Sequence, residues 1–140
     1  MPEALHFHYT VDGQDFTSAG AASVDVKKRL RLLGISPEIV RRVSIAMYEG
    51  EINMVIHANG GTITVAISDM EIEMILADQG PGIKDISKAM QAGYSTAPEE
   101  VRSLGFGAGM GLPNMKKFSD EFQIESTPGI GTTVTMKVFL

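Results

Sequence analysis

The sequence predicts one α/β domain in which helices cover one face of a mixed sheet. Two observations support this fold class. Alternation of apolar and polar residues marks strands, apolar residues at helical spacing mark helices, and their order along the chain is β-α-α-β-β-loop-α-β-β. The length of 140 residues suits one domain with a buried core and is too short for a second domain of ordinary size.

The N-terminal half is predicted to contain one strand and two helices. The strand covers residues 5–11, where every second residue is apolar. A helix is expected from about Phe16 to Leu33, and Gly34 is placed to end it. Ser36-Pro37 is typical of a helix start, so the second helix is expected from Pro37 to His57 or Ala58. Its apolar stripe is predicted to be Ile45, Tyr48, Ile52, Val55 and Ile56.

The C-terminal half is predicted to contain two pairs of strands around a long loop and a helix. The first pair, around residues 62–67 and 72–76, forms an antiparallel hairpin. Residues 79–110 show little periodicity beyond a short helical candidate at 86–92, and a segment of that length is usually functional. The remaining elements are a helix at 112–118 and strands at 122–126 and 132–139.

Composition excludes several classes of function. The chain has no cysteine, so disulfides, thiol catalysis and Cys-ligated metal sites are absent. A formal net charge of −5 argues against direct binding to nucleic acid, which requires clustered Lys and Arg. No apolar run approaches the ~20 residues of a membrane span, and the N-terminus does not resemble a signal peptide. We therefore expect a cytoplasmic protein that does not bind membranes.

Two groups of polar residues are placed where they can serve chemistry. Glu49, Asn53 and His57 recur every four residues on the second helix, and form one stripe beside its buried face. Asp78 ends a strand and precedes two spaced glycines, so its carboxylate can accept a hydrogen bond from an exocyclic amine such as that of adenine. The alternatives are a solvated helix edge and an ordinary turn.

A third feature is the glycine-rich run over residues 105–111, which leads directly into the helix at Leu112. Glycines allow backbone amides to approach an anion, and the start of a helix carries a partial positive charge. The run is neither a Rossmann fingerprint nor a Walker A loop, because it lies late in the chain and no Gly-Lys-Ser/Thr ends it. A flexible linker is the alternative.

Taken in order, these motifs resemble those of a known superfamily. Glu49-x-x-x-Asn53, Asp78-x-Gly80-x-Gly82 and Gly107-x-Gly109-x-Gly111 resemble the N, G1 and G2 boxes of the Bergerat-fold (GHKL) ATPases. Gly131-Thr132 resembles the Gly-Thr that closes the adenine pocket in that superfamily. The resemblance implies a histidine-kinase-like ATP-binding domain over residues 1–140, a two-layer sandwich with a mixed, mostly antiparallel sheet and an ATP lid at about 79–110.

The resemblance also implies a role for each motif residue. Glu49 would be the catalytic base that acts on the attacking hydroxyl, and Asn53 would contact the nucleotide and hold Mg²⁺. Asp78 would bind the adenine amino group, with Thr132 supporting it through water. The other positions that would contact ATP are Gly80, Gly82, Gly105, Gly107, Gly109, Gly111 and Leu112.

Within the superfamily, the chain resembles the stand-alone bacterial anti-sigma factors and stressosome switch kinases. Gly93-Tyr94-Ser95-Thr96 is similar to the switch kinases, whereas residues 98–103 lengthen the lid. The implied function is that of an ATP-binding anti-sigma regulatory factor that phosphorylates serine or threonine on a small antagonist protein. The alternative is a non-catalytic module in which ATP gates the docking of a sigma factor or another regulatory partner. The implied ligands are ATP or ADP with Mg²⁺, and the analogy allows a homodimer.

Overall fold

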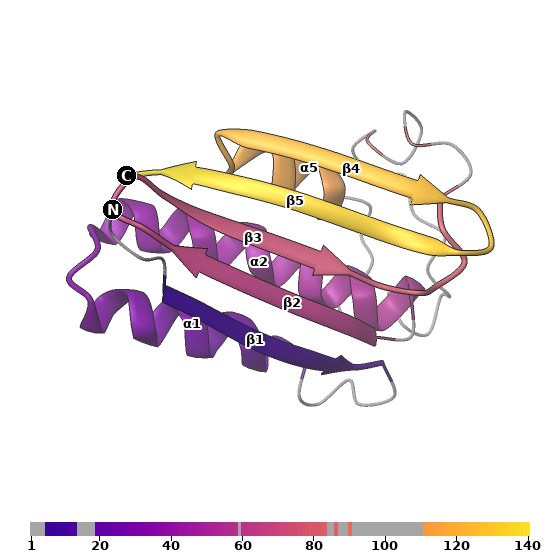
Figure 1. Cartoon of the computed structure of the whole chain (residues 1–140), viewed down its shortest axis with the longest axis horizontal. Coiled ribbons are helices and arrows are strands. Elements are labelled where there is room, and N and C mark those ends of the chain that lie inside the picture. The colour runs from indigo at the N-terminus through magenta and orange to yellow at the C-terminus, as the bar shows by residue number, and fades with distance from the viewer. Residues whose placement is uncertain (1–4, 14–18, 59, 84–85, 87–89, 91–110) are drawn as a thin grey trace.

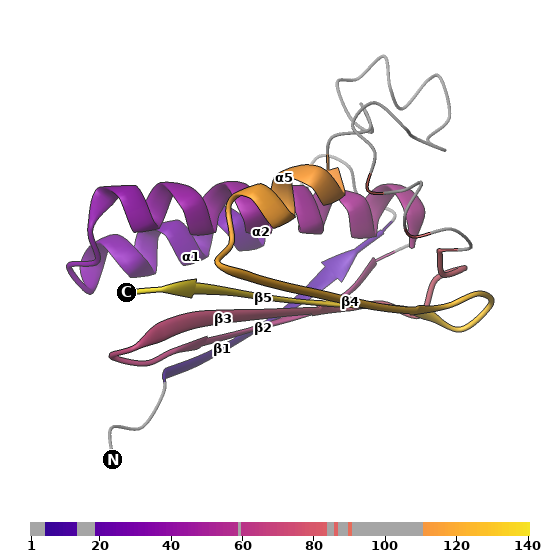
Figure 2. The same ribbon diagram turned by 90° about the horizontal axis from the view of Figure 1, so that it is seen from above.

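The computed structural model describes residues 5–13, 19–58, 60–83, 86, 90 and 111–140. It contains a five-stranded sheet with helices on one face (Figures 1 and 2). The elements in chain order are β1 (Leu5–Asp12), α1 (Ala21–Leu32), α2 (Pro37–His57), β2 (Gly60–Ile67), β3 (Glu71–Ala77), α5 (Gly111–Lys117), β4 (Glu121–Thr127) and β5 (Gly131–Phe139). The predicted α/β sandwich is confirmed. The short helical candidate at 86–92 falls mostly outside the described residues.

The prediction of a mixed sheet is wrong for the described strands. Their order is β1-β2-β3-β5-β4, and every neighbouring pair is antiparallel. Because α1 runs opposite to β1, α2 runs opposite to α1, and β2 runs opposite to α2, β2 is antiparallel to β1 (Figure 1). β3 and β4 do point the same way, since each is antiparallel to β5. However, β5 lies between them, so no parallel pair forms.

The core lies between the sheet and the helices. Along the strands most inward residues are apolar, as the alternation in the sequence predicts; in β3 they are Ile72, Met74 and Leu76, each at most 3% exposed. Ser126 of β4 and Thr132 of β5 are polar exceptions at the ends of their strands. The helices add fully buried side chains such as Val26, Leu30, Val43, Met47 and Met115. None of the helices in the described part of the chain combines the length and the apolar character needed to cross a membrane.

The ends of α1 are only partly as predicted. The helix starts at Ala21 rather than Phe16: Gly20 adopts a left-handed conformation with φ +97°, and residues 16–18 lie outside the described part. At the other end, Gly34 has φ +77°, and the N–H of Ile35 donates to the carbonyl of Leu30 at 3.1 Å. This is the left-handed helix ending that glycine favours, so the prediction for Gly34 is confirmed.

The bounds of α2 are confirmed, but its predicted apolar stripe is partly wrong. Ser36 accepts a hydrogen bond from the N–H of Ile39 at 3.4 Å, and Pro37 is the first helical residue. Tyr48, which was expected in the stripe, is 40% exposed. Helices α1 and α5 pack on either side of α2, and the sheet lies below it (Figure 2). The buried part of the α2 surface is therefore wide, and it is not centred on the predicted stripe. The buried residues are Val40, Val43, Ala46, Met47, Gly50, Glu51, Ile52, Met54 and Val55.

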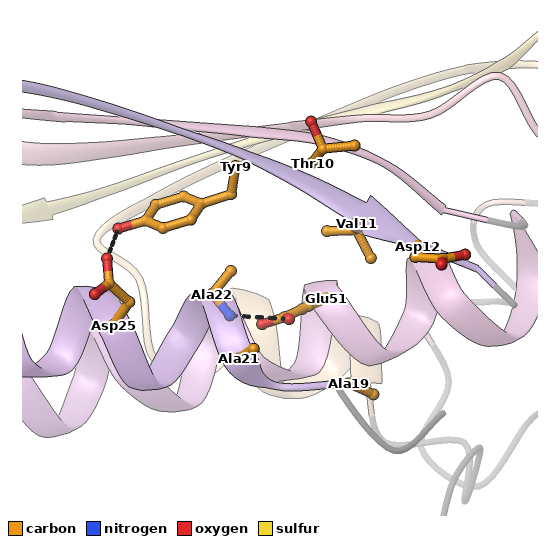
Figure 3. Close-up of a pocket in the computed structure, with 9 residues that line it drawn as sticks. All are labelled: Tyr9, Thr10, Val11, Asp12, Ala19, Ala21, Ala22, Asp25 and Glu51. Atoms are coloured by element: carbon orange, nitrogen blue, oxygen red, sulfur yellow. Dashed lines mark hydrogen bonds between the residues drawn. The ribbon is translucent and has the colours of Figure 1, made fainter. Parts of the chain in front are cut away.

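Glu51 of α2 caps the start of α1 (Figure 3). The N-cap residue of α1 is Gly20, which has no side chain for this purpose. The carboxylate of Glu51 is 2% exposed. It accepts hydrogen bonds from the backbone N–H groups of Gly20, Ala22 and Ser23 at 2.9, 3.2 and 3.0 Å, and from the Ser23 hydroxyl at 2.7 Å. These donors offset the loss of hydration, and the charge faces the positive end of α1.

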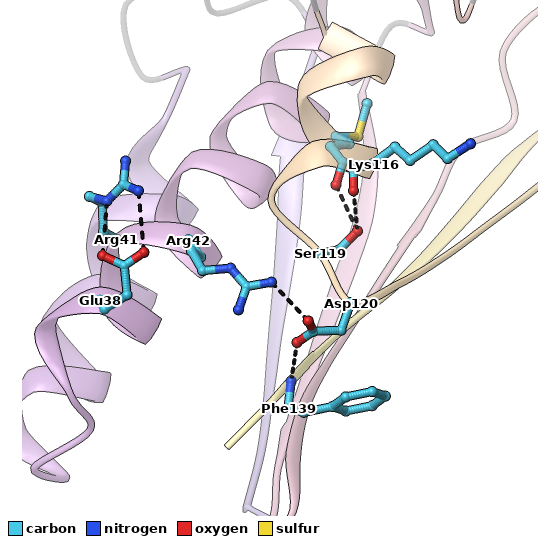
Figure 4. A network of polar contacts seen from close by, with 8 residues as sticks. Glu38, Arg41, Arg42, Lys116, Ser119, Asp120 and Phe139 are labelled. Atoms are coloured by element: carbon cyan, nitrogen blue, oxygen red, sulfur yellow. Dashed lines mark hydrogen bonds and ion pairs between the residues drawn. The ribbon is translucent and has the colours of Figure 1, made fainter.

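Asp120 connects α2 to the sheet just after α5 (Figure 4). Its carboxylate accepts hydrogen bonds from the N–H of Phe139 at 2.7 Å and from Arg42 of α2 at 3.1 Å. The Phe139 N–H and, less strongly, the Arg42 guanidinium hold the pKa of Asp120 below its usual range. These contacts fix the C-terminal end of α5 relative to α2 and β5.

Gly50 allows α2 to approach both β3 and α5 closely. A Cβ atom at this position would collide with the side chain of Leu76 and would lie 3.2 Å from Sδ of Met115. Both neighbours are buried, at 3% and 0% exposure, and have no free space to move into. A glycine inside a helix costs about 1 kcal/mol relative to alanine, and this close packing explains why it is present.

Replacing Glu51 with alanine is expected to lower the free energy of unfolding by about 2–4 kcal/mol, because three backbone N–H groups at the start of α1 lose their acceptor. Chemical denaturation followed by circular dichroism measures the change. Glu125→Ala, on an exposed position of β4, is the control and should change the value by less than about 0.5 kcal/mol. A loss as small as that of the control would show that Glu51 does not stabilise α1.

Replacing Gly50 with alanine is expected to destabilise the protein by about 1–3 kcal/mol despite the better helix propensity of alanine, because the added methyl group overpacks the core. The cost should shrink in a Leu76→Ala background, in which the colliding side chain is gone. A double-mutant cycle by chemical denaturation tests this coupling. Strictly additive costs would mean that Leu76 is not what limits the space beside Gly50.

Candidate functional site

The predicted site residues in the described part of the chain gather around the end of the sheet where β3 ends and β5 begins (Figure 1). The C-terminal end of α2 lies at the same end of the molecule, since the turn after β3 packs against Ala58. The start of α5 faces Glu49 of α2. Motifs that lie far apart in the sequence are therefore brought together by the fold.

Asp78 follows β3 directly, and backbone groups hold its carboxylate in place. Oδ1 accepts hydrogen bonds from the N–H of Gly80 at 2.9 Å and the N–H of Thr132 at 3.2 Å. The N–H of Asp78 donates to the carbonyl of Thr132 at 2.9 Å, which extends the pairing of β3 and β5 by one residue. Oδ2 makes no hydrogen bond to the described residues, so it is available to a ligand.

Two glycines of the predicted motifs stand where backbone segments touch. A Cβ atom at Gly80 would lie 2.6 Å from Cα of Ala58, so a larger residue would push the turn away from α2. Gly131 has φ +153°, and a Cβ atom there would collide with the carbonyl of Asp78. These glycines keep the turn after β3 packed between α2 and the start of β5.

Ser126 of β4 fastens the turn after β3 to the β4–β5 hairpin. Its hydroxyl accepts a hydrogen bond from the N–H of Ile83 at 2.7 Å and lies 2.8 Å from the hydroxyl of Thr132. Thr132 is 8% exposed, so its orientation is set by this network. Ser126 was not predicted to be a site residue. The available signal was a polar residue at an inward position of an alternating strand, where a hydroxyl needs a partner.

Glu49 and Asn53 lie one helical turn apart on α2, and both are partly buried. The side-chain amide of Asn114 in α5 donates to Oε1 of Glu49 at 3.4 Å. The other oxygen, Oε2, lies toward Gly111, since a Cβ atom at Gly111 would be 3.8 Å away from it. Asn53 makes no hydrogen bond to the described residues. Asn114 was not predicted to be a site residue, because it belongs to none of the motifs.

His57, the third residue of the predicted stripe, is partly buried at the end of α2. Burial lowers the pKa of His57, which favours the neutral imidazole. A neutral ring does not complement the negative end of the helix dipole as a charged one would. His57 is therefore placed for packing and hydrogen bonding rather than as a cation.

Part of the predicted phosphate-binding run cannot be placed, since Gly105, Gly107 and Gly109 lie outside the described residues, as does most of the lid predicted at 79–110. Gly111 is the first residue of α5, which confirms the helix predicted at 112–118. Leu112 is 6% exposed and its side chain belongs to the core. Any contact between Leu112 and a phosphate would come from its backbone N–H.

The described residues fit a divalent cation only if most of its ligands come from elsewhere. They contain no group of three or more His, Cys, Asp or Glu side chains that could hold a metal ion. Asn53 offers one amide oxygen. Mg²⁺ commonly keeps several waters and binds through one or two protein ligands together with substrate phosphates. The site thus suits a cation that arrives with a nucleotide.

A separate cavity of about 230 Å³ lies on the other side of α2, between β1 and the start of α1 (Figure 3). Its polar groups bond to one another: the hydroxyl of Tyr9 donates to Asp25 at 2.6 Å, and Glu51 caps α1. Burial and the neighbouring Asp25 raise the pKa of Tyr9 to about 12. None of the predicted site residues lines this cavity. Its polar contacts attach the edge strand β1 to α1.

Comparison with known proteins supports the motif assignment. The profile of the histidine kinase-like ATPase domain matches residues 15–138. An anti-sigma F factor of Caldanaerobacter subterraneus subsp. tengcongensis is 39% identical over 108 residues, which cover 74% of this chain and 72% of that protein. The serine/threonine-protein kinase RsbT of Bacillus subtilis is 35% identical over 106 residues, 73% of this chain and 74% of that protein.

A solved structure shows the same fold. The crystal structure of the RsbU and RsbW domains of Rv1364c from Mycobacterium tuberculosis matches 96% of this chain and 31% of that chain with a TM-score of 0.65, at 18% identity. The family profile spans nearly the whole chain, and both relatives exceed 30% identity over more than two thirds of their own length. Together with the four ordered motifs and the fold, these matches establish that the chain is an ATP-binding domain of the histidine kinase-like ATPase family.

Proposed function

We propose that this protein is an anti-sigma regulatory factor that acts as an ATP-dependent serine/threonine kinase on a small antagonist protein. Two of its relatives are an anti-sigma F factor and a serine/threonine-protein kinase. The observation that supports the proposal most strongly is the carboxylate of Glu49, which has one oxygen held by Asn114 and the other without a partner among the described residues.

Asp78 would bind the adenine end of the nucleotide. Because Oδ1 is occupied by two backbone N–H groups, the free Oδ2 is the oxygen that would accept a hydrogen bond from the adenine amino group. Thr132, whose backbone N–H bonds the same carboxylate, would support this contact through water. Guanine has a carbonyl in place of that amino group and would face Oδ2 with a second acceptor, so the site would select ATP over GTP.

Glu49 and Asn53 would act at the phosphate end of the nucleotide, where the transfer takes place. Bound Mg²⁺-ATP would supply the phosphoryl group and neutralise charge during its transfer, which depends mainly on positioning and electrostatics. Asn53 would hold the cation through its amide oxygen. Glu49 would receive the proton of the attacking serine or threonine hydroxyl at Oε2, the oxygen that faces the start of α5. Glu49 and Asn53 can take these two roles at one site because they lie one helical turn apart on α2.

Replacing Asp78 with asparagine is expected to weaken ATP binding by about 1.5–3 kcal/mol, roughly 10- to 150-fold in Kd. Asparagine can keep the Oδ1 acceptor that the backbone uses, but it presents an N–H donor to the adenine amino group in place of Oδ2. The same N–H donor suits the carbonyl of guanine, so the preference for ATP over GTP should fall.

Isothermal titration calorimetry with ATP and GTP measures both effects. Asp69→Asn, in the exposed turn between β2 and β3, is the matched control and should bind like the wild type. Equal affinity of the wild type for ATP and GTP, or an unchanged Asp78→Asn variant, would rule out adenine recognition by Asp78.

Replacing Glu49 with glutamine is expected to slow phosphoryl transfer about 10²–10⁴-fold while ATP affinity changes little, because the base is lost and the shape is kept. Asn53→Ala should weaken both, since it removes the proposed cation ligand. The assay incubates the protein with labelled ATP and a candidate antagonist and detects phosphoserine or phosphothreonine on the antagonist. Glu125→Gln is the matched control, because this residue lies on an exposed position of β4.

Two outcomes would contradict the proposal. Transfer by Glu49→Gln at the wild-type rate would remove Glu49 from the role of base. No transfer by the wild type, combined with ATP-dependent binding of a sigma factor or antagonist, would identify a non-catalytic module gated by ATP.

A further inference from the structure

We infer that Asn114 is a positioning residue for Glu49, which holds one carboxylate oxygen so that the other is presented to the substrate. Nothing in the motifs assigns a role to Asn114, which lies just beyond the glycine-rich run. The inference rests on the proposed function, because that function gives Glu49 its role as base.

The contact joins two helices at one carboxylate. The side-chain Nδ2 of Asn114 in α5 donates to Oε1 of Glu49 in α2 at 3.4 Å, across 65 positions of sequence. Oε2 lies toward Gly111, also in α5, and that residue has no side chain to cover it. Among the described residues, α5 thus provides a donor for one oxygen and places a glycine beside the other.

The neighbours of Asn114 keep it in place. Met115 is fully buried, and its sulfur would lie 3.2 Å from a Cβ atom on Gly50, the residue after Glu49. Leu112 is 6% exposed and also belongs to the core. Because Leu112 and Met115 fix the position of α5 against α2, the backbone of Asn114 is held where its amide reaches Glu49. A base held within a narrow range of orientations loses less entropy when it acts.

The chemistry of an amide suits this role. A neutral N–H donor holds a carboxylate oxygen by a hydrogen bond, yet it adds no charge that would compete for the proton or the phosphates. The described charged residues of the packed elements lie elsewhere. Glu51 is bonded to α1, and Lys116 and Lys117 are exposed in the last turn of α5. The inward residues of β3 beneath α2 are apolar. Asn114 is thus the polar group of α5 that contacts the Glu49 carboxylate.

The first experiment tests the contact with Glu49 directly, without any need for activity. Carbon-13 NMR records the side-chain carboxyl signals at neutral pH, and the signal missing in Glu49→Gln identifies residue 49. Asn114→Leu should shift this signal because the hydrogen bond to Oε1 is lost. Asn114→Asp, which keeps the shape and replaces the amide donor with a carboxylate, should shift it as well. Gln123→Leu, on an exposed position of β4, is the matched control and should leave it unchanged.

The second experiment measures phosphoryl transfer to the antagonist as a function of ATP concentration. In Asn114→Leu, kcat should fall about 10-fold with little change in KM for ATP. A residue that only supported the fold would weaken ATP binding and stability together with kcat. Asn114→Ser, which retains a shorter donor, should recover part of kcat if it restores the bond.

The two experiments separate failure of this inference from failure of the proposed function. An unchanged Glu49 carboxyl signal in both Asn114→Leu and Asn114→Asp would overturn the positioning role, whatever the activity. A shifted signal in these variants, with no transfer by the wild type, would support the contact and overturn the kinase. Should Asn114→Leu lower the thermal midpoint strongly, the isosteric Asn114→Asp variant still decides, because its carboxylate must change the Glu49 signal if the side chains touch.

Discussion

The packing of α2 against β3 and α5 at Gly50 determines where every described part of the site lies. Leu76, which occupies the space beside Gly50, is two residues before Asp78, and Met115, which occupies the other side, directly follows Asn114. Glu49 directly precedes the glycine. The three elements thus pack tightly next to Glu49, the proposed base, and Asp78 and the start of α5 take their positions from this contact. A methyl group at Gly50 would move all three apart.

Glu49 and Glu51 lie two residues apart on α2, and their different surroundings give one a possible chemical role and the other a structural one. Glu51 points toward α1 and is 2% exposed, and its oxygens accept bonds from three backbone N–H groups and a hydroxyl. A group so fully bonded has no capacity left for a ligand. Glu49 points toward α5 and accepts one bond in the described structure. Because residues at i and i+2 of a helix face different directions, α2 can present Glu51 to α1 and Glu49 to α5.

The sequence predicted the local structure well where the signal was itself local. Strands followed from alternation, and the ends of helices followed from residues such as Gly34 and Ser36-Pro37, whose own backbone or side chain forms the cap. The errors arose where distant parts of the chain decide. Tyr48 is exposed because α1 and α5 flank α2, and the sheet is wholly antiparallel because β5 inserts between β3 and β4. Glu51 was missed for the same reason, since its partners lie about thirty residues away.

The glycines of the motifs show what a motif can and cannot predict. In the described part of the chain, the contacts of Gly80 and Gly131 are with protein backbone, at Ala58 and Asp78, so close packing alone is enough to require them. The sequence predicted a turn after Asp78 and linked these glycines to a nucleotide, but it did not predict that backbone segments meet at them. The case for nucleotide recognition depends on the oxygen of Asp78 that the same packing leaves unbonded. The packed backbone occupies Oδ1 of Asp78 and fixes the orientation of the carboxylate. The remaining oxygen, Oδ2, is the one that would recognise the nucleotide.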